Sequence, residues 1–107
     1  MNVEMSRMEA RIRLGGVFDG SRAMQLLNAL GRFKVGQVVV DFSGIQQFEP
    51  FGVEVLANGL AGPPRGGARV RCLGLPPCVA ERLREEEIAM GALGSMSVEE
   101  RQMGLPM

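Results

Sequence analysis

The sequence predicts an α/β fold with a mainly parallel β-sheet, because strand-like and helix-like hydrophobic patterns alternate along it. Residues 38–42 form a short, valine-rich apolar run that is typical of an interior strand. Residues 9–14 and 68–73 alternate polar and apolar side chains, as half-exposed strands do. Helical patterns separate these runs, and such alternation indicates parallel strands joined by right-handed crossovers.

Three helices are predicted from apolar side chains spaced three and four residues apart. The first covers residues 22–32 and follows the turn Asp19-Gly-Ser21, in which Ser21 is the expected N-cap. The second covers residues 52–60, and the third follows the breaker Pro76-Pro77. The core is expected to contain Leu26, Leu30, Val38, Val40, Phe42, Val55, Leu56, Leu60, Val70 and Leu83.

The last part of the sequence is expected to add a short strand and a fourth helix. Residues 93–96 fit a short strand. Ser97 to Glu100 have the spacing of a capping box, which predicts a helix over residues 98–103.

Composition argues against several functional classes. The 12 basic and 12 acidic residues cancel, so the chain has no electrostatic footprint for nucleic acid. No apolar run approaches the ~18 residues of a membrane span, so we expect a cytoplasmic protein without direct membrane insertion. Two cysteines and no histidine make a metal site unexpected. We expect one domain over residues 1–107, with residues 1–7 and 104–107 flexible.

Three carboxylates stand at expected strand ends, namely Asp19, Asp41 and Glu49. Either they face one rim of the sheet, or they cap turns and helix N-termini through backbone amides, which is the interpretation we adopt. No nucleophile with a base, and no paired catalytic carboxylates, stand out. We therefore expect no enzymatic activity and no cofactor.

Two linked segments resemble the signature of the STAS family, the sulfate-transporter and anti-sigma-factor-antagonist domain. These are Asp41-Phe-Ser-Gly-Ile45 and Phe48-Glu-Pro-Phe-Gly-Val53. Val17 to Ala23 is similar to the family's entry into its first helix, and Gly67 to Val79 looks like its later strand and Pro-containing loop. The resemblance implies a mixed, mainly parallel sheet of four or five strands covered by about four α-helices, with an early strand at a sheet edge.

The resemblance also implies a function. Family members act in bacterial signal transduction as antagonists of anti-sigma kinases, or as accessory subunits, and they dock through the loop and helix that hold a phosphosite. We therefore expect a non-enzymatic regulatory module that binds a protein partner, either an anti-sigma kinase-like or another regulatory protein. The sequence leaves open whether the chain also forms a homodimer. The alternatives are an accessory STAS subunit of a phospholipid-transport ABC system and a small-ligand-sensing STAS domain.

The same match identifies candidate partner-binding residues. They are Phe48, Glu49, Pro50 and Phe51 in the loop, with Asp19 and Ser21 at the first helix. Glu49 keeps a carboxylate where the family has aspartate, and Pro50 stiffens the loop. Phe51 is an interface anchor if its ring is exposed, but phenylalanine is also a common core residue, so the sequence leaves both possibilities open.

We expect no phosphorylation at the usual family position. In phosphorylated members the second serine of Asp-Ser-Ser-Gly accepts phosphate, and Phe51 occupies that position without a hydroxyl. Ser43 is the nearest alternative, and its expected role is a local backbone hydrogen bond. Intact-mass analysis of protein isolated from its host is expected to show no phosphate on this segment. A stoichiometric phosphate mapped to residues 41–53 would overturn the prediction.

Overall fold

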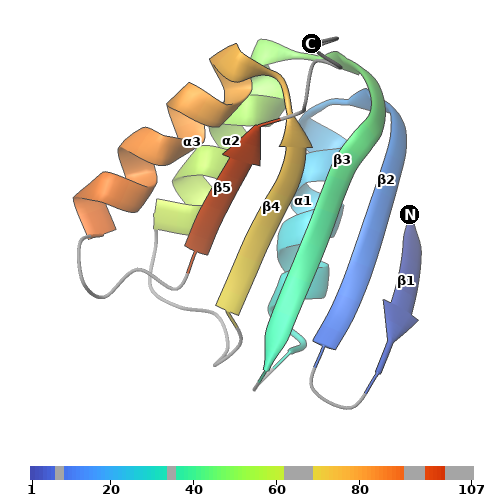
Figure 1. The fold of residues 1–107 in the computed structure, drawn as a ribbon. Helices are drawn as coiled ribbons and strands as arrows, with labels where there is room; N and C mark the ends of the chain where they lie inside the picture. The colour runs from blue at the N-terminus through green and yellow to red at the C-terminus, as the bar shows by residue number, and fades with distance from the viewer. Residues whose placement is uncertain (7–8, 34–35, 62–68, 91–95, 101–107) are drawn as a thin grey trace, which may run out of the picture.

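The computed structural model describes residues 1–6, 9–33, 36–61, 69–90 and 96–100, which form five strands and three α-helices (Figure 1). The elements are β1 (Asn2–Met5), β2 (Glu9–Phe18), α1 (Gly20–Leu30), β3 (Gln37–Phe48), α2 (Pro50–Ala61), β4 (Arg69–Leu75), α3 (Pro77–Met90) and β5 (Met96–Glu100). Residues 104–107, which we expected to be flexible, lie outside the described part. None of the described helices is long and apolar enough to cross a bilayer.

The five strands form one sheet in the order β1-β2-β3-β4-β5. β1 is antiparallel to β2, whereas β2 to β5 are parallel to one another. Because each crossover advances in the same direction, the three helices lie on one face and the other face is open (Figure 1). This confirms the expected mixed, mainly parallel sheet and the early edge strand implied by the resemblance.

The core fills the space between the sheet and its helix layer. Of the ten expected core residues, Val55, Leu60 and Val70 pack against it partly buried, and the others are buried. Ala23, Leu26, Leu27 and Leu30 turn one side of α1 towards the sheet. Met24 belongs to the same apolar spacing but is 48% exposed, so it lies outside the core.

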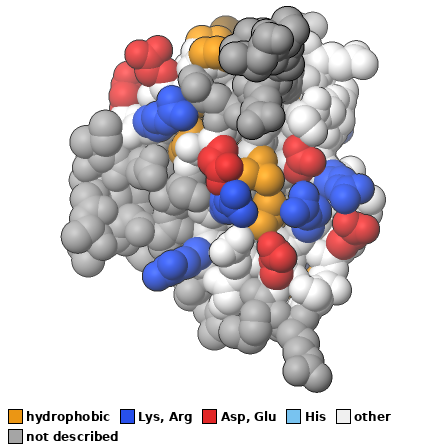
Figure 2. Space-filling model, viewed as in Figure 1, with side chains coloured by type: hydrophobic (Ala, Val, Ile, Leu, Met, Phe, Trp, Pro, Cys, Tyr) orange, Lys and Arg blue, Asp and Glu red, His pale blue; other side chains and the backbone are white. Residues whose placement is uncertain are grey.

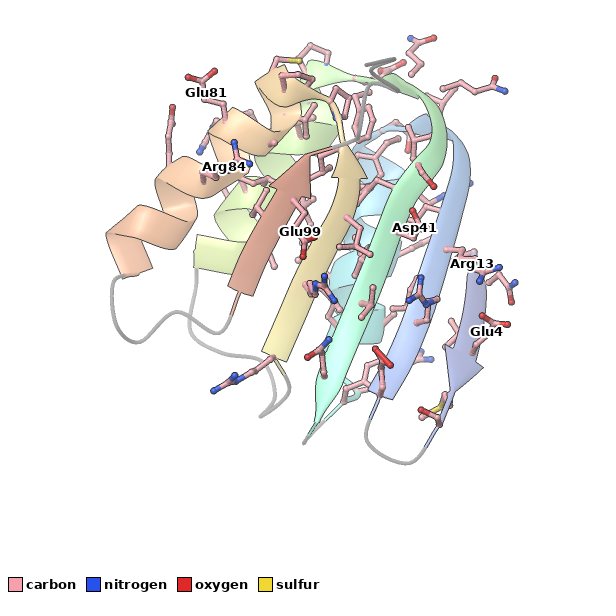
Figure 3. The ribbon with its side chains drawn as sticks, in the orientation of Figure 1. Glu4, Arg13, Asp41, Glu81, Arg84 and Glu99 are labelled. Carbon is pink, nitrogen blue, oxygen red and sulfur yellow. The ribbon has the colours of Figure 1, made fainter. Side chains whose placement is uncertain are left out.

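Charged side chains of both signs gather on the open face of the sheet, around an apolar strip (Figure 2). Val39 on this face is fully buried, and its neighbours in register are Arg11 on β2 and Arg71 on β4. Arginine stems can shield an apolar side chain while their guanidinium groups stay in water. Arg71 also pairs with Glu99 on β5, and Arg13 Nη2 lies 3.4 Å from Glu4 Oε1 on β1 (Figure 3).

The third strand is longer than the sequence predicted, because it continues from Phe42 to Phe48 instead of entering a turn. The Ser43 amide donates to Asp41 Oδ1 at 2.9 Å, a local backbone-to-side-chain bond of the kind found in turns. Pairing with β2 nevertheless continues through two register shifts, and Gly15 and Gly44 stand opposite each other between these shifts. A Cβ at Gly44 would lie 2.7 Å from the Leu14 carbonyl oxygen, so this close pairing requires glycine.

The predicted helix over residues 98–103 is wrong where the structure describes it, because residues 96–100 form β5. Val98 is buried and stands opposite Cys72 of β4 in the parallel ladder. Cross-strand burial therefore outweighs the capping-box spacing. The described part of the chain thus has three helices rather than the expected four, and residues 93–95 and 101–103 lie outside it.

The buried middle of β3 gives a direct test of this core. Val40→Asp places a carboxylate at a fully buried site. None of the buried side chains in the described part of the chain is polar, so none of them can pair with this carboxylate. Burying an unpaired charge costs several kcal/mol, comparable to the ~5–15 kcal/mol stability of a small domain. We expect the variant to lose its cooperative thermal unfolding transition, while Val17→Asp at an exposed position of β2 keeps it. An unchanged melting temperature for Val40→Asp would contradict the placement of β3.

Candidate functional site

Three phenylalanine rings form a platform under the carboxyl ends of β2 and β3. Phe18 lies 5.5 Å from Phe42 and 5.7 Å from Phe48 between ring centroids, and Phe42 lies 6.1 Å from Phe48. Phe18 and Phe42 are buried, whereas Phe48 is half-buried. The sequence placed Phe48 among the partner-binding residues. In the structure its ring packs against Phe18 and Phe42, and only part of the residue is exposed.

The first helix begins above this platform at Gly20, with Asp19 as its N-cap. Asp19 Oδ1 accepts a hydrogen bond from the Arg22 amide at 2.9 Å. The expected N-cap, Ser21, lies instead inside the first turn and is exposed. The prediction of the helix start was thus late by two residues, because Asp19 caps at least as well as serine and glycine tolerates the first helical position.

The second helix begins directly beside the first. The Glu49 amide donates to the Phe18 carbonyl at 2.9 Å, and the Glu49 carbonyl accepts from the Val53 amide at 3.1 Å as the helix starts. Pro50 is the first helical residue, where a missing amide hydrogen costs nothing. The end of β3, the cap and the helix thus follow one another without a loop, and Glu49 and Pro50 are both exposed.

Glycines bring the two helix starts into backbone contact. A Cβ at Gly52 would lie 2.6 Å from the Asp19 carbonyl carbon, so α2 approaches the cap of α1 closely. A Cβ at Gly20 would lie 2.7 Å from ring atoms of Phe51, so the Phe51 ring rests on Gly20. Further along, Gly59 of α2 faces Leu27 of α1 in the same way.

The Phe51 ring is exposed over 72% of its surface, which answers the question that the sequence left open. Gly20 and Met24 are four residues apart and share one side of α1, as Phe51 and Val55 share one side of α2. Since the Phe51 ring rests on Gly20, both sides face the junction of the helices. We call Gly20, Met24, Phe51 and Val55 the seam surface.

A groove lies on the other side of α2, between α2 and α3. Its volume is about 510 Å³. Apolar walls come from Phe48, Pro50, Val53, Pro76 and Val79, and the remaining lining residues are Gln46, Glu54, Cys78 and Arg82.

Two polar groups of the groove pair with each other. Arg82 Nε and Nη2 donate to the two carboxylate oxygens of Glu54 at 2.8 and 3.0 Å. This hydrogen bond lowers the pKa of Glu54 below its ordinary value. Sequence reasoning missed the groove, because its walls come from three elements whose packing no single motif reveals.

Asp41 is separate from this site. It lies within β3, and although burial raises its pKa, the hydrogen bonds from Ser43 and the nearby Arg11 and Arg13 lower the pKa overall. Asp19 acts as a helix cap and Asp41 accepts a turn hydrogen bond, so for these two the capping interpretation is confirmed. The described residues hold no group of three potential metal ligands.

The arrangement is thus an exposed apolar surface on a glycine-built junction, at the carboxyl ends of the parallel strands. A family model described as "Mlab, STAS domain" matches residues 1–89. The chain belongs to the STAS family. That match spans both helices of the seam surface and includes Phe51. None of the curated proteins compared with the chain matches it.

The glycine junction of this STAS domain gives a second test. Gly52→Ala forces a Cβ against the Asp19 backbone, which cannot move aside as a side-chain end can. We expect it to destabilise the domain by roughly 1–3 kcal/mol, the usual cost of overpacking. Gly59→Ala meets only the Leu27 side chain and gains up to ~1 kcal/mol of helix propensity, so its loss is expected to be smaller. Thermal melting checks the order; an unchanged melting temperature for Gly52→Ala would contradict the backbone contact.

Proposed function

We propose that this STAS domain is a non-enzymatic protein-binding module that docks its partner through the seam surface, and that it binds constitutively. The observation that carries the proposal is the exposed Phe51 ring. A large apolar side chain at 72% exposure costs solvation free energy unless something covers it. Covering an aromatic ring of this kind is a common source of binding free energy at protein interfaces.

The support beneath Phe51 also favours docking. The ring rests on Gly20, and its helix start is fixed by Pro50 and by the contact of Gly52 with Asp19. A partner therefore meets a surface whose backbone is already ordered, and little conformational entropy is lost on binding. Glu49 and Ser21, which are exposed, and Asp19, which is half-buried, stand near the starts of the two helices and would offer polar groups for the rim of an interface.

Constitutive binding follows from the chemistry of position 51. A serine at this position allows a kinase to add two negative charges and so to switch an interface off. Phenylalanine removes this possibility and adds apolar surface instead. We infer that a phosphate-gated switch is replaced here by a standing contact, within a regulatory or signalling assembly in the cytoplasm.

The partner has two candidate classes. The first is an anti-sigma kinase-like or other regulatory protein, as for the antagonists of the family. The second is the ATPase of a phospholipid-transport ABC system, with this chain as the accessory STAS subunit; the Mlab description of the matching family model favours it. A small-ligand sensor receives less support, because Arg82 and Glu54 in the groove neutralise each other.

Phe51→Asp tests the docking surface. Because the ring is exposed, we expect the substitution to leave the melting temperature nearly unchanged. It is expected to weaken the partner complex by about 2 kcal/mol or more, as loss of an aromatic anchor does. The partner is first recovered by pull-down from the native host; a serine kinase indicates the first partner class, and a transport ATPase indicates the second. Calorimetry then measures the affinity of the variant and of the wild type for that partner.

A matched control separates the ring from the added charge. Gln25→Glu adds the same charge to an exposed position of α1 that does not lie on the side shared by Gly20 and Met24. It is expected to bind the partner within about 0.5 kcal/mol of the wild type. A folded Phe51→Asp variant that binds with full affinity would remove the seam surface from the interface.

A further inference from the structure

Strand β1 is the least covered part of the fold. Val3 and Met5 stand opposite Ile12 and Ala10, whose side chains are buried under the helix layer, so all four point to the same face of the sheet. Figure 1 shows β1 at the edge of the sheet, beyond the helices. Val3 is accordingly 42% exposed and Met5 70% exposed, and Met1 is exposed as well.

The outer edge of β1 also has free hydrogen-bonding groups. The Ser6 amide donates to the Glu9 carbonyl at 2.8 Å at the end of the β1–β2 ladder. Groups directed at the neighbour alternate along an antiparallel strand, so Asn2 and Glu4 direct their amides and carbonyls to β2. Val3 and Met5 direct theirs outward, where no described segment pairs with them.

We propose that two copies of this chain pair through β1 in antiparallel orientation, with Val3 of one copy opposite Val3 of the other. This register sets Met1 opposite Met5 and Asn2 opposite Glu4. Apolar side chains then face one another on the helix side of the joined sheet, and polar ones face one another on the open side. The outward amides and carbonyls of Val3 form the central hydrogen-bonded pair.

Charge and side-chain alternation select this register over its neighbours. A shift by one residue places apolar side chains opposite polar ones. A shift by two residues in one direction sets Glu4 opposite Glu4, and like charges directly opposite each other destabilise a ladder. A shift by two residues in the other direction leaves Glu4 and Met5 without partners.

A second copy is also the occupant that fits the strand best. An isologous interface uses the same surface of both copies, and the free edge of β1 is complementary to itself in the proposed register. In the proposed register Glu4 faces Asn2 of the other copy and keeps its ion pair with Arg13 of its own chain, so no like charges stand opposite each other. β1 contributes no residue to the seam surface, and pairing through it leaves both copies free to bind a partner.

Val3→Pro is the first test. The Val3 amide points away from β2, so proline removes no β1–β2 hydrogen bond and is tolerated at such an edge position. It does remove the two central bonds of the dimer. Sedimentation analysis from about 1 μM to about 1 mM is expected to show the wild type rising from 11.5 kDa towards twice that mass, and Val3→Pro remaining a monomer with unchanged thermal melting.

Opposite charges at the same position test the register. Val3→Glu and Val3→Lys each place like charges opposite themselves, and each is expected to lower the association constant about tenfold or more. An equimolar mixture of the two is expected to restore a heterodimer, because glutamate then faces lysine. A wild type that stays monomeric over the whole range, a Val3→Pro variant that still dimerises, or a mixture that stays as weak as its components would overturn the proposal.

Discussion

The long pairing of β2 with β3 is the constraint on which the rest of the structure depends. The two strands stay paired from Glu9 and Gln37 to Phe18 and Phe48, although the register shifts twice beside the glycines. This pairing brings the carboxyl ends of both strands together, and the Glu49 amide donates to the Phe18 carbonyl there. The N-termini of α1 and α2 therefore lie close together, and Gly52 of α2 contacts the backbone of Asp19.

The same one-directional winding explains why the two faces of the sheet differ. Placing every helix on one face lets a short chain build a core with a single sheet surface. The other face is protected by side chains, and the arginines beside Val39 do this, Arg71 together with its partner Glu99. The helix layer ends before β1, which leaves the edge strand with apolar side chains and free backbone groups.

Local sequence patterns predicted the type of most helices and strands. Pairing between strands that are distant in sequence determined the features that these patterns could not predict. The valine run of β3 and the spacing in α1 gave the correct type of element, because burial acts on residues that are close in sequence. The Ser43 amide makes a local hydrogen bond to Asp41 Oδ1, yet Gly15 and Gly44 allow the ladder to continue past it. In β5, pairing of Val98 with Cys72 outweighed a capping box, and no local pattern contains that partner.

The candidate site shows the same division. Motif matching located Phe51, but the exposure of its ring depends on Gly20, which is 31 positions earlier in the sequence. The ring rests on Gly20, and glycine has no side chain that could shield the ring from solvent. The platform of Phe18, Phe42 and Phe48 fills the core directly below the helix starts. With that space occupied and the backbones of α1 and α2 already in contact, a ring at position 51 has to lie on the surface. In the proposed function, this outward ring is what the start of α2 offers to a partner, and its position follows from the packing beneath it.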